Sequence, residues 1–216
     1  MHTQTSKWVY IVGFIILGLY SIYLVAMEIL VSQAFVRNYF TDIWEGVRFY
    51  AINTTLSVTF LWFTALLFVI SAVCIRESTV NRKLYYFYLS QVIIFAYLGF
   101  DDRFLVHETL TDKFNINDGL FLVGIGMIEI LLLLSVRKQL SSKMIWLLMI
   151  AAFFFGVMTL IDQFVPREAV PRLSLEDLSK TWANVFIFLF AWETCMQNIR
   201  QLKQSAMWPN KNLANS

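Results

Sequence analysis

Six stretches of this chain are long, apolar and nearly free of charged side chains, and they restrict the possible folds more than any other feature. They cover residues 8–33, 51–75, 84–100, 119–136, 144–161 and 181–198. A helix needs about 20 apolar residues to cross a bilayer, and in lipid every backbone polar group must be bonded within the chain. Because 58% of the residues are hydrophobic and only 15% are charged, we predict an all-α integral membrane protein. Its single domain, residues 1–216, would be a bundle of six transmembrane helices.

The distribution of Lys and Arg predicts which helix ends face the cytoplasm. If both termini are cytoplasmic, the inner segments hold most of the basic residues: Lys7, Arg76, Arg82, Lys83, Arg137, Lys138, Lys143, Arg200, Lys203 and Lys211. Aromatic residues mark the predicted membrane edges, with Trp8, Tyr85, Tyr86, Trp146 and Trp208 inside and Tyr39, Trp44, Tyr50 and Trp182 outside. We therefore predict an N-in, C-in protein of a bacterial inner (cytoplasmic) membrane, surrounded by lipid and without nucleic acid as a partner.

A dense group of charges, FDDRFLVHETLTDKF at residues 100–114, directly follows an uncharged apolar run. If the helix continues into this segment, Asp101 and Glu108 lie on one face, and Arg103 and His107, four residues apart, lie on another. Carboxylates and an imidazole on neighbouring turns could bind a divalent cation or act as general acid and base. The alternative is an ordinary acidic turn where a helix leaves the membrane.

Further polar residues are expected at the same outer depth. Glu28 lies near the outer end of the first stretch, and the second stretch adds a polar stripe, Asn53, Thr55, Ser57 and Thr59. The predicted outer acidic site consists of Asp101, Asp102, Glu108 and Asp162. The candidate metal ligands are Asp101, His107, Glu108 and Asp162. In the alternative interpretation, Glu28 forms an ion pair with Arg103.

Three carboxylates lie within the apolar stretches, with Glu28 at the outer, Glu129 at the central and Glu193 at the inner depth. A charge at the centre of a membrane helix costs roughly 2.5–3.5 kcal/mol, so Glu129 needs a proton or a partner. Around one cavity, the three carboxylates would form a proton or cation route. Alternatively, Glu129 is protonated and only joins helices by hydrogen bonds. For Glu193 we expect Arg76 as the partner.

The segments between the stretches carry weaker signals. Residues 36–50 have apolar side chains at helical spacing, which predicts an amphipathic helix on the outer surface. Pro166 and Pro171 interrupt the chain before Ser174, which is predicted to cap a short helix. Residues 206–216 are predicted to form a loose cytoplasmic tail.

Several kinds of chemistry are excluded by composition. The only histidines are His2 and His107, so a single chain cannot form a bis-histidine haem site or a histidine-rich diiron site. HExxH, GxSxG and P-loop motifs do not occur. No catalytic residue is firmly assigned, and the candidates are His107 and Glu108.

Three hypotheses for the function remain. We favour a non-enzymatic component of cation- or proton-coupled transport or sensing, with Glu129 as the central protonatable group and an acidic outer vestibule. The first alternative is an enzyme that acts on lipids at the outer leaflet, with His107 and Glu108 as acid and base and a divalent cation as its cofactor. The second alternative is an accessory or sensor subunit that packs against itself or another membrane chain through Gly13, Gly18, Gly124, Gly126 and Gly156.

Overall fold

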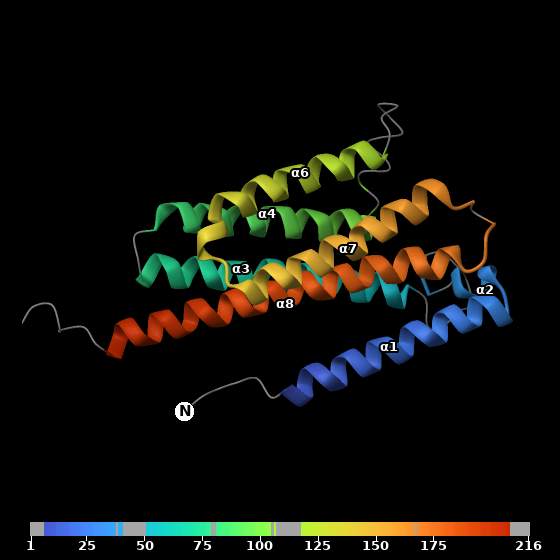
Figure 1. Cartoon of the computed structure of the whole chain (residues 1–216), viewed down its shortest axis with the longest axis horizontal. Helices are drawn as coiled ribbons and strands as arrows, with labels where there is room; N and C mark the ends of the chain where they lie inside the picture. The colour runs from blue at the N-terminus through green and yellow to red at the C-terminus, as the bar shows by residue number, and fades with distance from the viewer. Residues whose placement is uncertain are drawn as a thin grey trace, which may run out of the picture. The chain divides into compact units, whose positions relative to one another are not determined.

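The computed structural model describes residues 7–37, 39–40, 51–78, 81–104, 106, 118–166 and 168–207, of which nearly all are helical and none is in a strand. The helices in Figure 1 are, in order, α1 (Lys7–Leu30), α2 (Gln33–Arg37), α3 (Ile52–Ser78), α4 (Arg82–Phe104), α6 (Asp118–Val136), the short 3-10 helix η1 (Arg137–Gln139), α7 (Ser142–Phe164) and α8 (Arg172–Met207). The prediction of an all-α protein is confirmed.

Each predicted apolar stretch coincides with one of the long helices α1, α3, α4, α6, α7 and α8. Three segments are long and apolar enough to cross a membrane, namely Tyr10–Leu30, Ile52–Arg76 and Ser142–Phe164. These three segments are compatible with the predicted membrane protein. Their apolar side chains favour lipid as a solvent, and a helix bonds the backbone polar groups between its two ends within the segment itself.

Two predicted segments lie largely beyond the described residues. The prediction of a surface helix at 36–50 overlaps only the end of α2, because residues 41–50 lie outside the described part. The tail prediction is similar, since α8 extends to Met207 and residues 208–216 are not described. By contrast, the expected continuation of the third apolar helix past Phe100 is confirmed as far as Phe104.

The chain divides into two compact units. The first consists of Met1–Thr54 and Phe155–Thr181, and the second of Thr55–Phe154 and Trp182–Ser216. The boundaries between the units fall inside α3, α7 and α8.

In the first unit, Glu28 of α1 binds the amino-terminal end of α8. Its side chain is only 1% exposed. Its Oε1 atom accepts a hydrogen bond from the backbone N–H of Leu173 at 3.3 Å, and its Oε2 atom accepts one from Ser174 at 2.7 Å. The first N–H groups of a helix have no partner within the helix and carry partial positive charge. The buried carboxylate therefore satisfies them and is itself stabilised.

This contact corrects the prediction for Ser174. The helix begins at Arg172, and the acceptor for its first N–H groups is Glu28 rather than the Ser174 hydroxyl. That hydroxyl instead donates to the backbone oxygen of Leu24 at 3.4 Å. The predicted short helix is also not separate, because it forms the first turns of the 36-residue helix α8.

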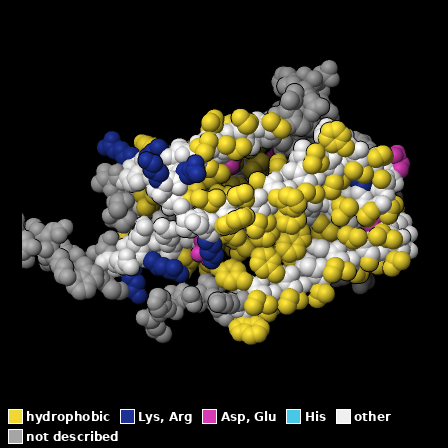
Figure 2. Space-filling model, viewed as in Figure 1, with side chains coloured by type: hydrophobic (Ala, Val, Ile, Leu, Met, Phe, Trp, Pro, Cys, Tyr) yellow, Lys and Arg dark blue, Asp and Glu magenta, His cyan; other side chains and the backbone are white. Residues whose placement is uncertain are grey.

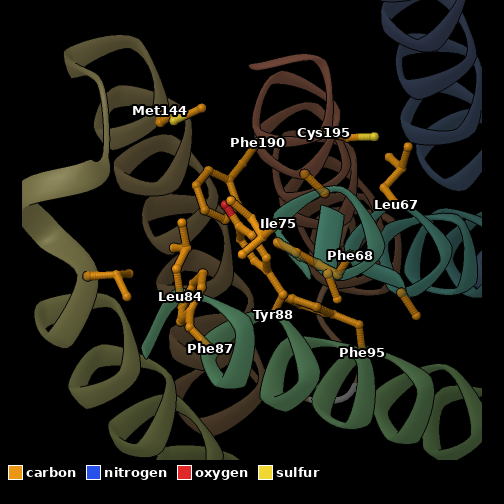
Figure 3. Close-up of a cluster of buried hydrophobic side chains, with 14 of the residues drawn as sticks. Leu67, Phe68, Ile75, Leu84, Phe87, Tyr88, Phe95, Met144, Phe190 and Cys195 are labelled. Carbon is orange, nitrogen blue, oxygen red and sulfur yellow. The ribbon is translucent and has the colours of Figure 1, made fainter. Parts of the chain in front are cut away.

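The core of the second unit is a cluster of aromatic rings around Phe68, which has no exposed surface. Its ring lies 5.9 Å from Tyr88, 5.9 Å from Phe95 and 6.0 Å from Phe190, measured between ring centroids. These neighbours come from α4 and α8, so a single side chain of α3 joins three helices (Figure 3). Such aromatic pairs contribute about 0.5–1.5 kcal/mol each beyond the burial of their surface.

Helices α3 and α4 approach closely at Gly99. A Cβ atom at this position would overlap the indole ring of Trp62. The absence of a side chain is therefore what allows the indole to lie across α4, where it also contacts Phe100 at a centroid distance of 5.6 Å. The five glycines that the sequence suggested for close helix packing differ from Gly99, because an added Cβ would meet nothing within 4 Å at any of them: Gly13, Gly18, Gly124, Gly126 and Gly156.

We expect Gly99→Ala to destabilise the second unit by about 1–3 kcal/mol, which is typical of overpacking a close contact. The measurement is the thermal unfolding temperature of the purified protein in mild detergent. Gly126→Ala is the matched control, because the added methyl group meets open space there. Equal unfolding temperatures for the two variants would contradict the close approach at Trp62.

We expect Glu28→Gln to lower the free energy of unfolding of the first unit by about 1.5–3 kcal/mol, because a hydrogen bond to a charged acceptor is replaced by one to a neutral amide oxygen. Thermal unfolding and limited proteolysis of the segment before α8 would report this loss. Glu168→Gln removes the same charge from an exposed turn and should leave both measurements unchanged. An unaltered Glu28→Gln protein would show that the carboxylate does not stabilise the start of α8.

Candidate functional site

Near the middle of α6, Glu129 forms a hydrogen bond with Gln91 of α4. The Gln91 Nε2 atom donates to Glu129 Oε2 at 2.8 Å. The Gln91 side chain is fully buried and Glu129 is half-buried. The flanking side chains Ile128 and Ile130 are 54% and 52% exposed. The carboxylate therefore meets α4 while its neighbours form the outer surface of α6.

This pair has two acceptor atoms that lack a donor. Within the described part of the chain, the buried atoms Gln91 Oε1 and Glu129 Oε1 have no hydrogen-bond partner. An amide oxygen and a carboxylate oxygen can only accept, whereas a protonated carboxyl group also has an O–H donor. One proton on Glu129 would supply the missing donor. A buried polar atom without a partner costs about 1–3 kcal/mol, so a proton on Glu129 would strengthen the link between α4 and α6.

A second polar group joins α3, α4 and α8. The Asn184 Nδ2 atom donates to Ser57 Oγ at 2.7 Å, and Ser57 Oγ donates to Asp102 Oδ2 at 2.6 Å. Ser57 and Asn184 are buried, and Asp102 is half-buried. The neighbouring Asp101 is also buried, at 3% exposure. Asp102, a member of the predicted outer acidic site, is thus joined by hydrogen bonds to both α3 and α8.

The predicted polar stripe on the second apolar stretch requires a correction. Asn53 and Ser57, four residues apart, are both buried, whereas Thr55 is exposed and Thr59 is half-buried. The Thr59 hydroxyl donates to the backbone oxygen of Thr55 within the same helix. Residues two apart point to different sides of a helix, so the four side chains cannot form one stripe. Asn53 belongs to the first unit, where Thr181 Oγ1 donates to its Oδ1 at 3.1 Å.

The remaining polar contacts of the second unit lie toward its other end. Asn198 Nδ2 of α8 donates to the Tyr88 hydroxyl of α4 at 3.0 Å. Glu193 forms an ion pair with Lys143 of α7 at 2.5 Å. The partner that the structure shows for Glu193 is therefore Lys143 rather than the expected Arg76, since Lys143 lies at the start of the neighbouring helix.

The polar contacts occur at separate levels along α4. Tyr88 and Gln91 lie one turn apart, but Gln91 and Asp102 are separated by about 16 Å at 1.5 Å per residue. Between Gln91 and the neighbouring buried Asp101, the buried positions of α4 are Phe95 and Gly99. The hydrogen bonds of the Gln91–Glu129 pair are therefore not continuous with those of Asp102 along the buried face of α4.

Two other predicted site residues lie in the first unit. Glu28 binds the start of α8, as described above. Asp162 forms an ion pair with Arg172 at 2.9 Å, and Arg172 also lies 3.1 Å from Glu176. These contacts hold the end of α7 near the start of α8. The suggested pairing of Glu28 with Arg103 is replaced in the structure by the backbone N–H groups of α8.

The candidate catalytic residues His107 and Glu108 lie outside the described residues. Among the residues that the structure does describe, no group of three or more His, Cys, Asp or Glu side chains could hold a metal ion. The proposed metal ligands Asp101 and Asp162 belong to different units of the chain. The metal hypothesis thus depends on the segment around His107.

Sequence reasoning did not identify the amide partners Gln91, Asn184 and Asn198. Each pairs with a residue far away in the chain, at separations of 38 residues for Gln91, 127 for Asn184 and 110 for Asn198. A usable signal was present in α8, because Asn184 and Asn198 are fourteen residues apart and so recur on one helix face. Their presence in an apolar helix could have marked that face as one that packs against other helices.

No curated protein and no solved structure matches the chain. A family described as a domain of unknown function, DUF8692, matches residues 6–194. The match extends from the start of α1 into the middle third of α8, and it includes Glu28, Gln91, Asp102 and Glu129. Because it covers far more than half of the 216 residues, the chain belongs to the DUF8692 family.

Proposed function

We propose that this protein is a non-enzymatic component of proton- or cation-coupled transport or sensing, embedded in the membrane by six helices. The observation that carries the proposal is the Gln91–Glu129 pair, in which two buried acceptor atoms lack one donor. A proton is the smallest ligand that supplies this donor, and Glu129 is the group that would bind it.

The proposed orientation has both termini in the cytoplasm of a bacterial cell. The six long helices support it because an even number of spans returns the chain to the side where it began. In the second unit, the connections expected inside carry Arg82 and Lys83 at the start of α4 and Arg137 and Lys138 in η1. Basic residues in short loops favour the cytoplasmic side.

In this mechanism, the protonation state of Glu129 controls how strongly α4 and α6 are held together. An ionised carboxylate in the middle of a membrane helix is unfavourable by roughly 2.5–3.5 kcal/mol. The protonated form removes this charge and satisfies the amide oxygen of Gln91 as well. A change in proton supply would therefore alter the contact between the two helices. This change is the event that a sensor or a coupled transporter would use.

The two hydrogen-bonded groups of α4 are well separated along the helix, which favours binding of a proton at one site over its conduction through the protein. The Gln91–Glu129 pair and Asp102 are separated by about 16 Å, and Phe95 and Gly99 are the buried positions of α4 between Gln91 and Asp101. We assign Asp101 and Asp102 of the second unit to the acidic vestibule that raises the local cation concentration. Glu193, paired with Lys143, would be the inner member of the route.

A second candidate function, an accessory subunit of a larger membrane complex, is favoured by the open glycines. Added Cβ atoms at Gly13, Gly18, Gly124, Gly126 and Gly156 would meet nothing within 4 Å. Small residues on a lipid-facing surface permit close approach of another helix. Recovery of a stoichiometric partner chain in mild detergent would favour this function over an independent sensor.

We expect Glu129→Gln to remove a titrating carboxyl group without unfolding the protein. The new amide has N–H donors where the proton would lie, so it mimics the protonated state. The measurement is the infrared difference spectrum between acidic and alkaline buffer, in which the carbonyl band of a protonated carboxyl should be lost in the variant. Proton-dependent activity in proteoliposomes should be lost with it.

Two further variants make this test specific. Gln91→Leu keeps the carboxyl group but removes its partner, so the same band should remain and shift in frequency. Glu193→Gln removes a carboxylate that is already paired with Lys143 and should leave the band in place. If the full set of titrating bands persists in folded Glu129→Gln protein, Glu129 is not the proton-binding group.

The orientation predicts opposite labelling of two exposed positions. In a variant without Cys74 and Cys195, we expect Glu168→Cys to react with a membrane-impermeant maleimide in intact cells. Gln139→Cys, in the short connection between α6 and α7, should react only after the cells are opened. The reverse pattern would place the termini outside, and labelling of both positions in intact cells would contradict a span by α7.

A further inference from the structure

One end of the second unit is strongly basic. It is the end where α4 and α7 begin and where α3, α6 and α8 finish. The exposed basic residues here include Arg82, Lys83, Arg137, Lys138, Arg200 and Lys203. Figure 2 shows Lys and Arg side chains gathered at this end, at the left of the view. We call these six residues the basic end.

The basic end differs from the other cations in how it is paired. Lys143 forms an ion pair with Glu193, and Arg172 lies against both Asp162 and Glu176. None of the six residues of the basic end forms an ion pair with a residue in the described part of the chain. Their charges are therefore available to an anion from outside the protein.

Exposed aromatic rings lie one helical turn away from this charge. Tyr86 follows Lys83 by three residues on α4, so this ring shares a face with a cation of the basic end. Trp146 follows Lys143 by three residues on α7, and Lys143 is paired with Glu193 and lies outside the basic end as defined. Both Tyr86 and Trp146 are 63% exposed. They are the kind of side chain that occupies the boundary between headgroups and hydrocarbon.

Beyond the rings, the same helices expose apolar side chains. Ile93 of α4 is 70% exposed, and Met149 and Phe153 of α7 are 56% and 65% exposed. Cation, aromatic ring and aliphatic surface thus follow one another along each helix. A phospholipid has the same order of groups along its length, from phosphate through the ester region to the acyl chain.

We propose that the basic end binds the headgroups of anionic phospholipids in the leaflet that it faces. The cations are distributed over the ends of three helices and do not converge on one point, which suits several headgroups better than a single small anion. The adjacent rings and aliphatic surfaces bind acyl chains, which a soluble polyanion lacks. The proposal requires that the second unit crosses the bilayer, but it does not require proton binding by Glu129.

The test is native mass spectrometry of the full chain in mild detergent, titrated separately with phosphatidylglycerol and phosphatidylcholine. We expect the anionic lipid to bind more tightly, with an affinity that falls as salt is added. Each Lys or Arg near an anionic surface contributes about 1 kcal/mol, or roughly fivefold in affinity. The double variant Arg137→Gln/Lys138→Gln should therefore bind phosphatidylglycerol about 30-fold more weakly and leave phosphatidylcholine binding unchanged.

The matched control is Arg37→Gln, which removes an exposed cation from α2 in the first unit. It should retain wild-type lipid binding, and all variants should keep the wild-type unfolding temperature. Arg82→Gln/Lys83→Gln provides an independent variant if the first one is unstable. Equal affinity for the two lipids, or an equal loss in the control, would overturn the proposal. So would displacement of phosphatidylglycerol by inorganic phosphate or by an RNA oligonucleotide, because either would show that acyl chains are not part of recognition.

Discussion

A carboxyl or amide side chain in the middle of an apolar helix needs a hydrogen-bond partner on another helix, because lipid provides none, whereas a hydroxyl such as that of Thr59 can donate to a backbone oxygen of its own helix. The organisation of both units follows from this constraint. Glu28 of α1 is bonded to α8, Ser57 of α3 to α4 and α8, and Gln91 of α4 to α6. Each contact fixes the rotation of a helix about its own axis, which apolar packing alone specifies only weakly.

The two buried carboxylates show how different partners produce different properties. Glu28 meets two backbone N–H groups at the positive end of a helix, so both of its oxygens have donors while it carries its charge. Glu129 meets one amide N–H and keeps an oxygen without a donor. The first arrangement is complete without a proton, whereas the second is complete only with one. This difference explains why we assign a structural role to Glu28 and the proton-dependent role to Glu129.

The sequence was sufficient to predict the helices but not their contacts. The apolar stretches predict the ends of α3 and α7 to within three residues, since these limits depend mainly on local composition. The cap of α8 was predicted wrongly because Ser174 is a good local candidate, while the true acceptor, Glu28, lies 146 residues away. For the same reason, Glu129 was recognised as an unusual carboxylate before Gln91 was known as its partner. A contact between helices depends on their rotation and depth, which a single sequence does not specify.

The two units differ in how their charged side chains are paired. Acidic and basic groups of the first unit neutralise one another locally, as Arg172 does with Asp162 and Glu176. The basic end of the second unit has no such partners within the described chain and must be balanced from outside. Anionic headgroups would fix the depth of α4 in the bilayer, because Lys83 and the ring of Tyr86 bind at different levels. The other end of α4 carries Asp101 and Asp102, so the Gln91–Glu129 pair lies between the basic end and these two carboxylates along the helix.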